Sequence, residues 1–233
     1  RIIGPMLGTA LVLLVGPAWT IAFNAASFVV LAGAVALVRR SFRPVGGTHG
    51  TIMDRLVGGY RTVRSTTGCW HSIAMLVLYN LAVIPFVGLI PIYVHSEYHG
   101  GSSLAGMVAS AQGIGAILGG ISVTIIAHRH ARSFMIGRLI VALAVSLAIY
   151  AVAPNPLWVA VGSFLLGGSG AGFWITTSAI LQRDAPAASR GRVMSIMQAA
   201  TGLSYGIGLL VIGSIGDAVN LHVAFGFGAV MML

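Results

Sequence analysis

Lysine is absent from this sequence, and acidic residues are scarce, with four Asp or Glu side chains in 233 residues. Charged residues make up 7% of the chain, whereas ordinary soluble domains contain about 25%. Apolar residues make up 57%, and the mean hydropathy is +0.96. So few charges cannot cover the surface of a soluble globule of this size. The composition therefore predicts a protein whose apolar surface faces the lipid bilayer.

Cysteine is almost absent as well, since Cys69 is the single one. A lone cysteine excludes an internal disulfide and a cysteine-based metal cluster. The formal net charge is +9, and all of the basic residues behind it are arginines. These arginines lie between hydrophobic runs, whereas a nucleic-acid face gathers basic residues on one soluble surface. We therefore expect no nucleic-acid partner, no metal and no cofactor.

Long apolar runs dominate the rest of the chain. A membrane helix needs roughly 20 apolar residues to cross about 30 Å of hydrocarbon. Eight stretches meet or approach this length: 2–17, 19–38, 70–93, 103–127, 134–153, 157–182, 193–216 and 219–233. The fold class that we predict is all-α, a polytopic transmembrane bundle. Because the chain begins without Met and ends inside an apolar run, we expect both ends to be truncations.

The arginines alternate with the predicted spans in a way that predicts their orientation. The thirteen positions are Arg1, Arg39, Arg40, Arg43, Arg55, Arg61, Arg64, Arg129, Arg132, Arg138, Arg183, Arg190 and Arg192. All fall on one side of an eight-span threading, and the opposite connections contain none. Short loops rich in Arg stay cytoplasmic. We therefore expect a multi-pass protein of the cell (inner or plasma) membrane, with cytoplasmic arginine loops.

The only long polar stretch, residues 39–69, is a candidate linker. Within it, an apolar stripe recurs at helical spacing: Met53, Leu56, Val57, Tyr60 and Val63. This pattern favours a short helix that rests on the cytoplasmic headgroups. A solvated loop with incidental periodicity is the alternative.

Small residues recur at four-residue spacing inside several spans and predict close helix packing, because apolar burial contributes little between helices in lipid. The pairs are Ala109 and Gly113, Gly115 and Gly119, Gly168 and Gly172, and Gly202 and Gly206. The stretch GGSGAG at 167–172 lies inside an apolar run. It is therefore not a nucleotide loop, which would follow a strand and open a helix.

Three motifs resemble those of one transporter family. The opening RIIGPMLG, with Gly4, Pro5 and Gly8, is similar to the antiporter motif of major facilitator exporters, although Thr9 stands in place of a closing glycine. NAASF at 24–28 and QRDAPAASRGRVMS at 182–195 resemble the branch of drug:proton antiporters that contains macrolide-efflux proteins and the enterobactin exporter.

This resemblance implies that the chain holds helices five to twelve of a twelve-helix transporter that is a monomer when complete. Residues 1–38 would end the amino-terminal six-helix bundle, 39–69 would be the cytoplasmic linker, and 70–233 would form the carboxyl-terminal bundle with a truncated last helix. The family's charged turn appears here as AHRHAR at 127–132. Arg129 and Arg132 match it, but His128 stands where Asp is common.

Polar side chains at mid-membrane depth are costly and mark candidate sites. They are Tyr79, Asn80, Gln112, Trp174, Thr176, Thr177, Gln198 and Tyr205. The resemblance places spans 70–93 and 157–182 along a central cavity. We therefore predict a substrate cavity formed by Tyr79, Asn80, Gln112, Trp174 and Thr177, with Asn80 as hydrogen-bonding group and Trp174 as flat apolar wall. A purely structural interhelical role is the alternative for each.

Charged groups lie only near span ends. Arg129, Arg132, Asp184, Arg190 and Arg192 are predicted to form a cytoplasmic gate, with simple topology charges as the alternative. If transport is coupled to protons, the titrating carboxylate is expected upstream of this chain.

Together these features predict a secondary transporter, not an enzyme, that exports hydrophobic or amphipathic small molecules (drug, macrolide or siderophore) in exchange for protons by alternating access. Two alternatives remain. One is a signalling or scaffold protein of the same fold. The other is a membrane metalloenzyme that uses His95, Glu97 and His99, whose spacing does not match that of zinc proteases.

Overall fold

The computed structural model describes residues 3–37, 52–126, 132–218 and 220–232 of the chain. The chain divides into two compact units, Arg1–Thr51 and Ile52–Leu233. All regular elements in the described residues are helices, which confirms the predicted all-α fold. A helix pairs its backbone N–H and C=O groups within itself, as a segment in lipid requires.

The first unit consists of helix α1, Ile3–Ala36, which is interrupted at Gly16. Gly16 has a φ of 85°, a left-handed conformation that glycine adopts without steric cost, and Pro17 follows it. The break lies between the first two predicted spans, 2–17 and 19–38. The part after it, Ala18–Ala36, is long and apolar enough to cross a membrane.

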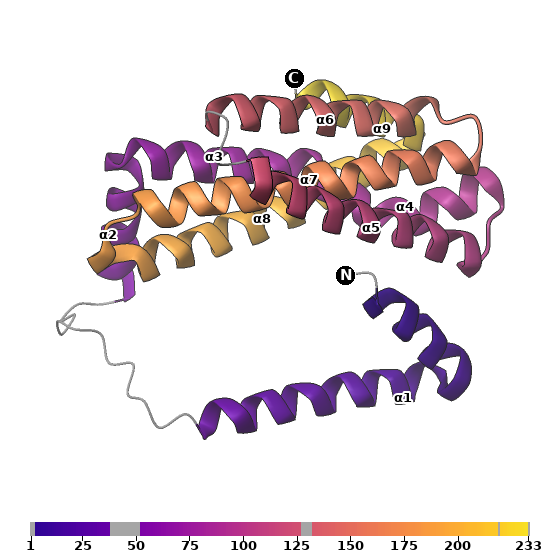
Figure 1. Cartoon of the computed structure of the whole chain (residues 1–233), viewed down its shortest axis with the longest axis horizontal. Coiled ribbons are helices and arrows are strands. Elements are labelled where there is room, and N and C mark those ends of the chain that lie inside the picture. Colours follow the sequence, from indigo (N-terminus) through magenta and orange to yellow (C-terminus); the bar gives the residue numbers. More distant parts are fainter. Residues whose placement is uncertain (1–2, 38–51, 127–131, 219, 233) are drawn as a thin grey trace. The chain divides into compact units, whose positions relative to one another are not determined.

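The second unit is a helical bundle (Figure 1). Its elements are α2 Ile52–Ser65, α3 Thr67–Ala82, α4 Ile84–Tyr98, α5 Ser102–Ile126, α6 Arg132–Val152, α7 Pro156–Asp184, the 3-10 turn Ala187–Ser189, α8 Arg190–Ala218 and α9 Leu221–Met231. The linker residues 52–65 therefore form the predicted short helix, α2, which belongs to this unit.

Six helical segments of the described chain meet the length and composition of a membrane span. They are Ala18–Ala36, Thr67–Tyr98, Ser103–Ile126, Phe134–Val152, Pro156–Asp184 and Arg190–Gly216. Each of the eight predicted stretches contains helix in the described residues, but two of them fall short of this length. The helical part of α1 before Gly16 and the helix Leu221–Met231 are both shorter than a span requires.

The predicted span 70–93 begins three residues earlier, at Thr67, and is interrupted at Val83. α3 ends at Ala82 and α4 begins at Ile84, with Val83 between them at φ −120° and ψ −49°. Pro85 causes the break, because its nitrogen has no hydrogen to donate to the carbonyl of Leu81 and its ring would clash with that carbonyl in a continuous helix. Pro91 lies inside α4 without ending it.

Asparagine side chains cap the N-termini of two helices at the end of the bundle opposite α2. Oδ1 of Asn155 accepts from the N–H groups of Leu157 and Trp158, at 3.1 and 3.3 Å. Oδ1 of Asn220 accepts from Val223 at 2.8 Å. These caps pair N–H groups that lack partners within the helix and so stabilise the starts of α7 and α9.

The most extensive helix contact joins α5 and α7, and glycines create it. A β-carbon on Gly115 would overlap the carbonyl oxygen of Phe164, and one on Gly119 would overlap that of Gly168. The predicted packing role of Gly115, Gly119 and Gly168 is thus confirmed. A β-carbon added at Gly202 or Gly206, by contrast, would have no neighbour within 4 Å among the described residues. On α8 it is Gly208 that approaches the backbone, at Leu81 of α3.

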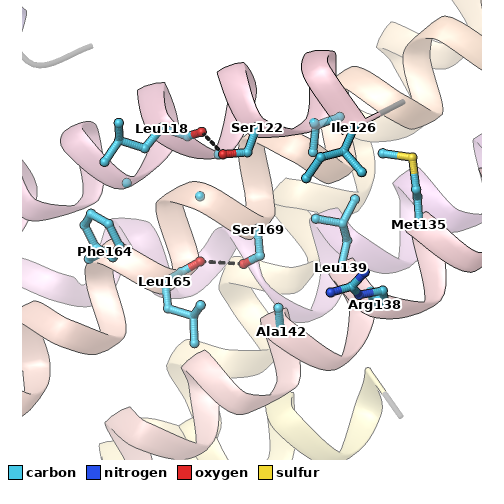
Figure 2. A pocket seen from close by; sticks show the side chains of 14 residues that line it. Leu118, Ser122, Ile126, Met135, Arg138, Leu139, Ala142, Phe164, Leu165 and Ser169 are labelled. Atoms are coloured by element: carbon cyan, nitrogen blue, oxygen red, sulfur yellow. Dashed lines mark hydrogen bonds between the residues drawn. The ribbon is translucent and has the colours of Figure 1, made fainter. Parts of the chain in front are cut away.

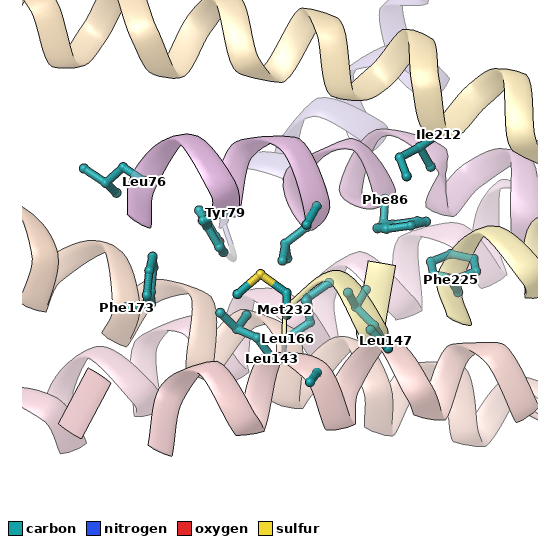
Figure 3. Close-up of a cluster of buried hydrophobic side chains, with 14 of the residues drawn as sticks. Leu76, Tyr79, Phe86, Leu143, Leu147, Leu166, Phe173, Ile212, Phe225 and Met232 are labelled. Carbon is teal, nitrogen blue, oxygen red and sulfur yellow. The ribbon is translucent and has the colours of Figure 1, made fainter. Parts of the chain in front are cut away.

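A continuous apolar core fills the bundle (Figure 3). Its largest members include Leu76 and Tyr79 of α3, Leu143 and Leu147 of α6, and Phe173 of α7. At one end, Phe225 stacks on Phe86 and on Tyr150, with ring centroids 4.5 and 4.7 Å apart. Side chains from α3, α4, α6, α7 and α9 thus hold the second unit together.

Helix α2 packs on the beginning of α8. Gly59 and Val63 are buried there, and a β-carbon on Gly59 would lie 2.7 Å from Cδ1 of Ile196. Val57 and Tyr60, which we placed on the same apolar stripe as Val63, are instead about half exposed. The stripe therefore divides between the bundle and the surface.

Candidate functional site

The α3 residues of the predicted cavity lie in the interior. Tyr79 is buried, and its ring lies 5.2 Å from the ring of Phe173 on α7. Its hydroxyl sits over Gly170, where a β-carbon would come within 2.6 Å of it. Asn80 is buried as well, and its Nδ2 donates to the carbonyl of Leu76, 2.7 Å away in the same helix. Tyr79 thus joins α3 to α7, whereas this bond of Asn80 stays within α3.

Trp174 and its neighbours occupy the α7 side of the predicted cavity. Phe173 faces α3, and Ile175 lies against Gly120 of α5. Successive helical residues turn by about 100°, so Trp174 points between these two neighbours. Its side chain is 37% exposed. Thr176 and Thr177, which follow, are both buried.

The hydroxyls on this part of α7 lack partners. Oγ1 of Thr176, Oγ1 of Thr177 and Oγ of Ser178 are buried, and no hydrogen bond is formed by any of them in the part of the chain that the structure describes. A buried hydroxyl without a partner costs roughly 1–3 kcal/mol. Serines elsewhere on the helices, such as Ser169 and Ser204, instead bond to a carbonyl of the preceding turn. The segment from Trp174 to Ser178 is therefore where α7 offers unused polar groups.

The other deep polar residues are dispersed. Gln112 lies on α5 opposite Gly167, is partly buried, and touches α7 through its backbone carbonyl. Gln198 of α8 is exposed. The hydroxyl of Tyr205, also on α8, lies beside Gly88 of α4. The structure therefore brings Tyr79 against Gly170 and Phe173 of α7. It does not place every predicted residue in one pocket.

The described arginines of the second unit gather at one end of the bundle, on α2, at the start of α6, at the end of α7 and at the start of α8 (Figure 1). Asp184 lies there and accepts from Nε of Arg183 at 2.8 Å. Its carboxylate also packs on Gly68 at the start of α3, where a β-carbon would overlap it. Negative charge is favourable at a helix N-terminus. Asp184 thus links the end of α7 to the start of α3.

For most of the remaining gate and motif residues, the structure describes only the exposure or the position along a helix. Arg190 and Arg192 are exposed, and the Arg192 guanidinium lies beside Gly58 of α2. Arg129 lies outside the described residues, and Arg132 is described only as the first residue of α6. Gly4, Pro5 and Gly8 lie on the backbone of α1 before Gly16.

A polar and aromatic cluster at the opposite end of the bundle was missed by the sequence reasoning. The hydroxyls of Tyr93 and Tyr98 donate to the carbonyls of Tyr150 and Ala153, at 3.0 and 2.8 Å. The hydroxyls of Tyr150 and Ser163 also bond to each other. Because helix C-termini leave carbonyls without intrahelical donors, these tyrosines cap the end of α6. Only the enrichment of tyrosine near span ends signals this cluster in the sequence.

Replacing Tyr93 with phenylalanine tests this cap. The hydroxyl deleted in Tyr93→Phe is buried and donates to α6, so we expect a loss of about 1 kcal/mol in the free energy of unfolding. Thermal unfolding in detergent measures it. Tyr60→Phe removes an exposed hydroxyl on α2 and should leave the midpoint unchanged. Equal midpoints for Tyr93→Phe and the parent protein would contradict the cap.

His95, Glu97 and His99, the alternative metal ligands, do not converge on one point. Nδ1 of His95 lies 3.4 Å from the carbonyl of Gly100, and Oε2 of Glu97 lies 3.4 Å from Nε2 of His222 on α9. His99, the residue that follows α4, has a left-handed conformation with φ 48°. Within the described residues, no three His, Cys, Asp or Glu side chains are grouped as metal ligands.

A protein-family model matches the whole chain. The family model described as transmembrane secretion effector, a model of the major facilitator superfamily, matches residues 1–233. No curated protein matches the chain. The family match therefore covers both units and every helix described above.

Proposed function

Because the chain belongs to the transmembrane secretion effector family of the major facilitator superfamily, we propose that it exports hydrophobic or amphipathic small molecules in exchange for protons. The observation that carries this proposal is the family match over the whole chain. Drugs, macrolides and siderophores are the classes of amphipathic substrate that we propose. The proposed mechanism is alternating access, in which two helical bundles rock about a central site.

The chemistry of the interior supports an amphipathic substrate. The buried polar side chains that the structure describes are serines, threonines and Asn80, and none carries a charge. Such an interior binds apolar surface and a few hydrogen-bonding groups, because no buried ion needs a counter-charge. We assign the contact region to Trp174, Thr176 and Thr177 of α7, with Tyr79 and Asn80 on α3 and Gln112 on α5.

The break at Val83 supports a moving α3–α4 segment. Discontinuous helices at transporter sites absorb the changes that open and close the path. We propose that the arginine-rich end, with Arg129, Arg132, Asp184, Arg190 and Arg192, closes the cytoplasmic side. The contact of Asp184 with Gly68 supports this assignment, since separation of α7 from α3 at that end would break it.

Efflux from cells that express Trp174→Ala tests the proposed site. Loss of a large apolar contact of this kind costs roughly 1.5 kcal/mol, so we expect efflux of an amphipathic dye to fall about tenfold. Trp174→Phe should retain most of the rate. Trp158→Ala, at the far end of the same helix and also exposed, is the matched control and should retain normal efflux. If the two alanine variants behave alike at equal expression, Trp174 is not in the substrate path.

A further inference from the structure

A hollow between α5, α6 and α7 lies apart from the proposed substrate residues (Figure 2). Its volume is about 460 Å³, within the roughly 300–1,000 Å³ typical of ligand sites. The apolar walls come from all three helices: Leu118, Ile126, Met135, Leu139, Phe164 and Leu165. Neither Trp174 nor the α3 residues line it.

Residues with small or no side chains create this hollow. Gly115 and Gly119 of α5, Gly168 of α7 and Ala142 of α6 all line it. The glycines bring α5 and α7 into backbone contact. Side chains of α6 line the hollow beside this contact (Figure 2). The shape therefore follows directly from the small residues of the α5–α7 contact.

The polar atoms of the walls need no ligand. Oγ of Ser122 donates to the carbonyl of Leu118 at 2.7 Å, and Oγ of Ser169 donates to that of Leu165 at 2.6 Å (Figure 2). Both hydroxyls are thereby satisfied within their own helices. The hollow thus presents an apolar surface along most of its length.

Arg138 is the single charged residue among those that line the hollow. It lies six residues after Arg132, the first residue of α6, which is about 9 Å along the helix at 1.5 Å per residue. Its guanidinium is exposed and lies 5.6 Å from the ring of Phe134. An arginine at this depth extends its charge to the headgroup level. There it matches the geometry of phosphate, to which a guanidinium donates two parallel hydrogen bonds.

The surface beside the hollow is apolar and exposed, with Ile125 on α5 and with Phe134 and Val141 on α6. A ligand that enters across such a surface arrives from the bilayer. We propose that this hollow binds an anionic phospholipid, with an acyl chain between α5 and α6 and the phosphate on Arg138. Basic pockets between membrane helices select anionic headgroups in this way. This site is independent of the proposed export path and of the compartment that the arginine-rich end faces.

Native mass spectrometry of the delipidated, intact protein tests the proposal, with dioleoyl phosphatidylglycerol and dioleoyl phosphatidylcholine as probes of equal chain length. One arginine near the headgroups is worth about 1 kcal/mol, so the anionic lipid should bind about fivefold more tightly. Arg138→Gln should remove this preference, and Arg138→Lys should keep part of it. Arg61→Gln, an exposed arginine of α2, removes equal charge outside the hollow and should leave the preference intact.

A variant that fills the hollow tests the contribution of the lipid acyl chain separately from that of the headgroup. Ala142→Phe places a ring between the walls and should weaken both lipids at least fivefold, with unchanged circular dichroism. The proposal is overturned if the parent protein binds both lipids equally or if Arg138→Gln keeps the preference. It is also overturned if Ala142→Phe binds both lipids normally, or if decanoate displaces the lipid and is itself exported, which would make the hollow a substrate site.

Discussion

Replacing Gly119 with alanine is expected to cost about 3 kcal/mol of stability and most of the folded yield, because the new β-carbon overlaps the carbonyl oxygen of Gly168. Neither atom belongs to a flexible side chain, so the backbones of α5 and α7 must move apart at this point. Adding Gly115→Ala, which overlaps the Phe164 carbonyl, should leave no folded protein. Thermal unfolding and monodisperse yield after solubilisation measure both effects.

The control is Gly106→Ala on the same helix. A β-carbon at Gly106 has no atom within 4 Å among the described residues, and alanine favours helix over glycine. This variant should therefore be as stable as the parent protein or more so. A Gly119→Ala protein that unfolds at the same temperature as Gly106→Ala would show that the α5–α7 contact is not as close as described.

Replacing Gly4 and Pro5 together should abolish net efflux while the protein still folds. These residues lie in the part of α1 before Gly16 and carry the resemblance to the antiporter motif. Glycine permits close helix approach, and proline removes one backbone hydrogen bond, so the pair favours a helix that can bend and slide. We expect the Gly4→Leu, Pro5→Ala double variant to lose at least tenfold in dye efflux at normal expression.

Gly33→Ala serves as its control on the same helix, since a β-carbon there also has no neighbour within 4 Å in the described part of the chain. It should export normally. Normal efflux by the double variant would show that transport does not require this motif.

Features that depend on local backbone chemistry were predictable from the sequence. The breaks at Gly16–Pro17 and before Pro85 follow from the conformations that these residues allow. The helix at Ile52–Ser65 followed from its apolar spacing. The packing of Gly115 and Gly119 followed from their four-residue spacing. In each case the determinant lies within one or two helical turns.

Features that depend on the partner helix were not predictable. Gly202 and Gly206 have the same spacing as Gly115 and Gly119, yet only the latter pair meets a neighbouring backbone. Periodicity shows that one face of a helix can pack closely, but it does not identify the facing helix. The contacts of Tyr93 with Tyr150 and of His222 with Ala151 join residues 57 and 71 positions apart. They exist only once α4, α6 and α9 have assembled.

The candidate site shows the same division. Hydropathy located Tyr79, Asn80, Trp174 and Thr177 within membrane helices, and the structure places Tyr79 against α7. The hydropathy pattern did not reveal the hydrogen bond of Asn80 within its own helix, nor the bond of Asp184 to the adjacent Arg183. Side-chain partners of this kind depend on rotamers and local geometry, about which the hydropathy pattern carries no information.

The most direct test of the account is export of an amphipathic fluorescent dye from preloaded cells that make the intact protein, with and without a protonophore. We predict that the protein accelerates dye efflux over vector-only cells, and that collapse of the proton gradient removes the acceleration. Efflux equal to that of vector-only cells, across cationic, neutral and anionic amphiphiles and with the gradient intact, would contradict the proposal that this protein is an exporter.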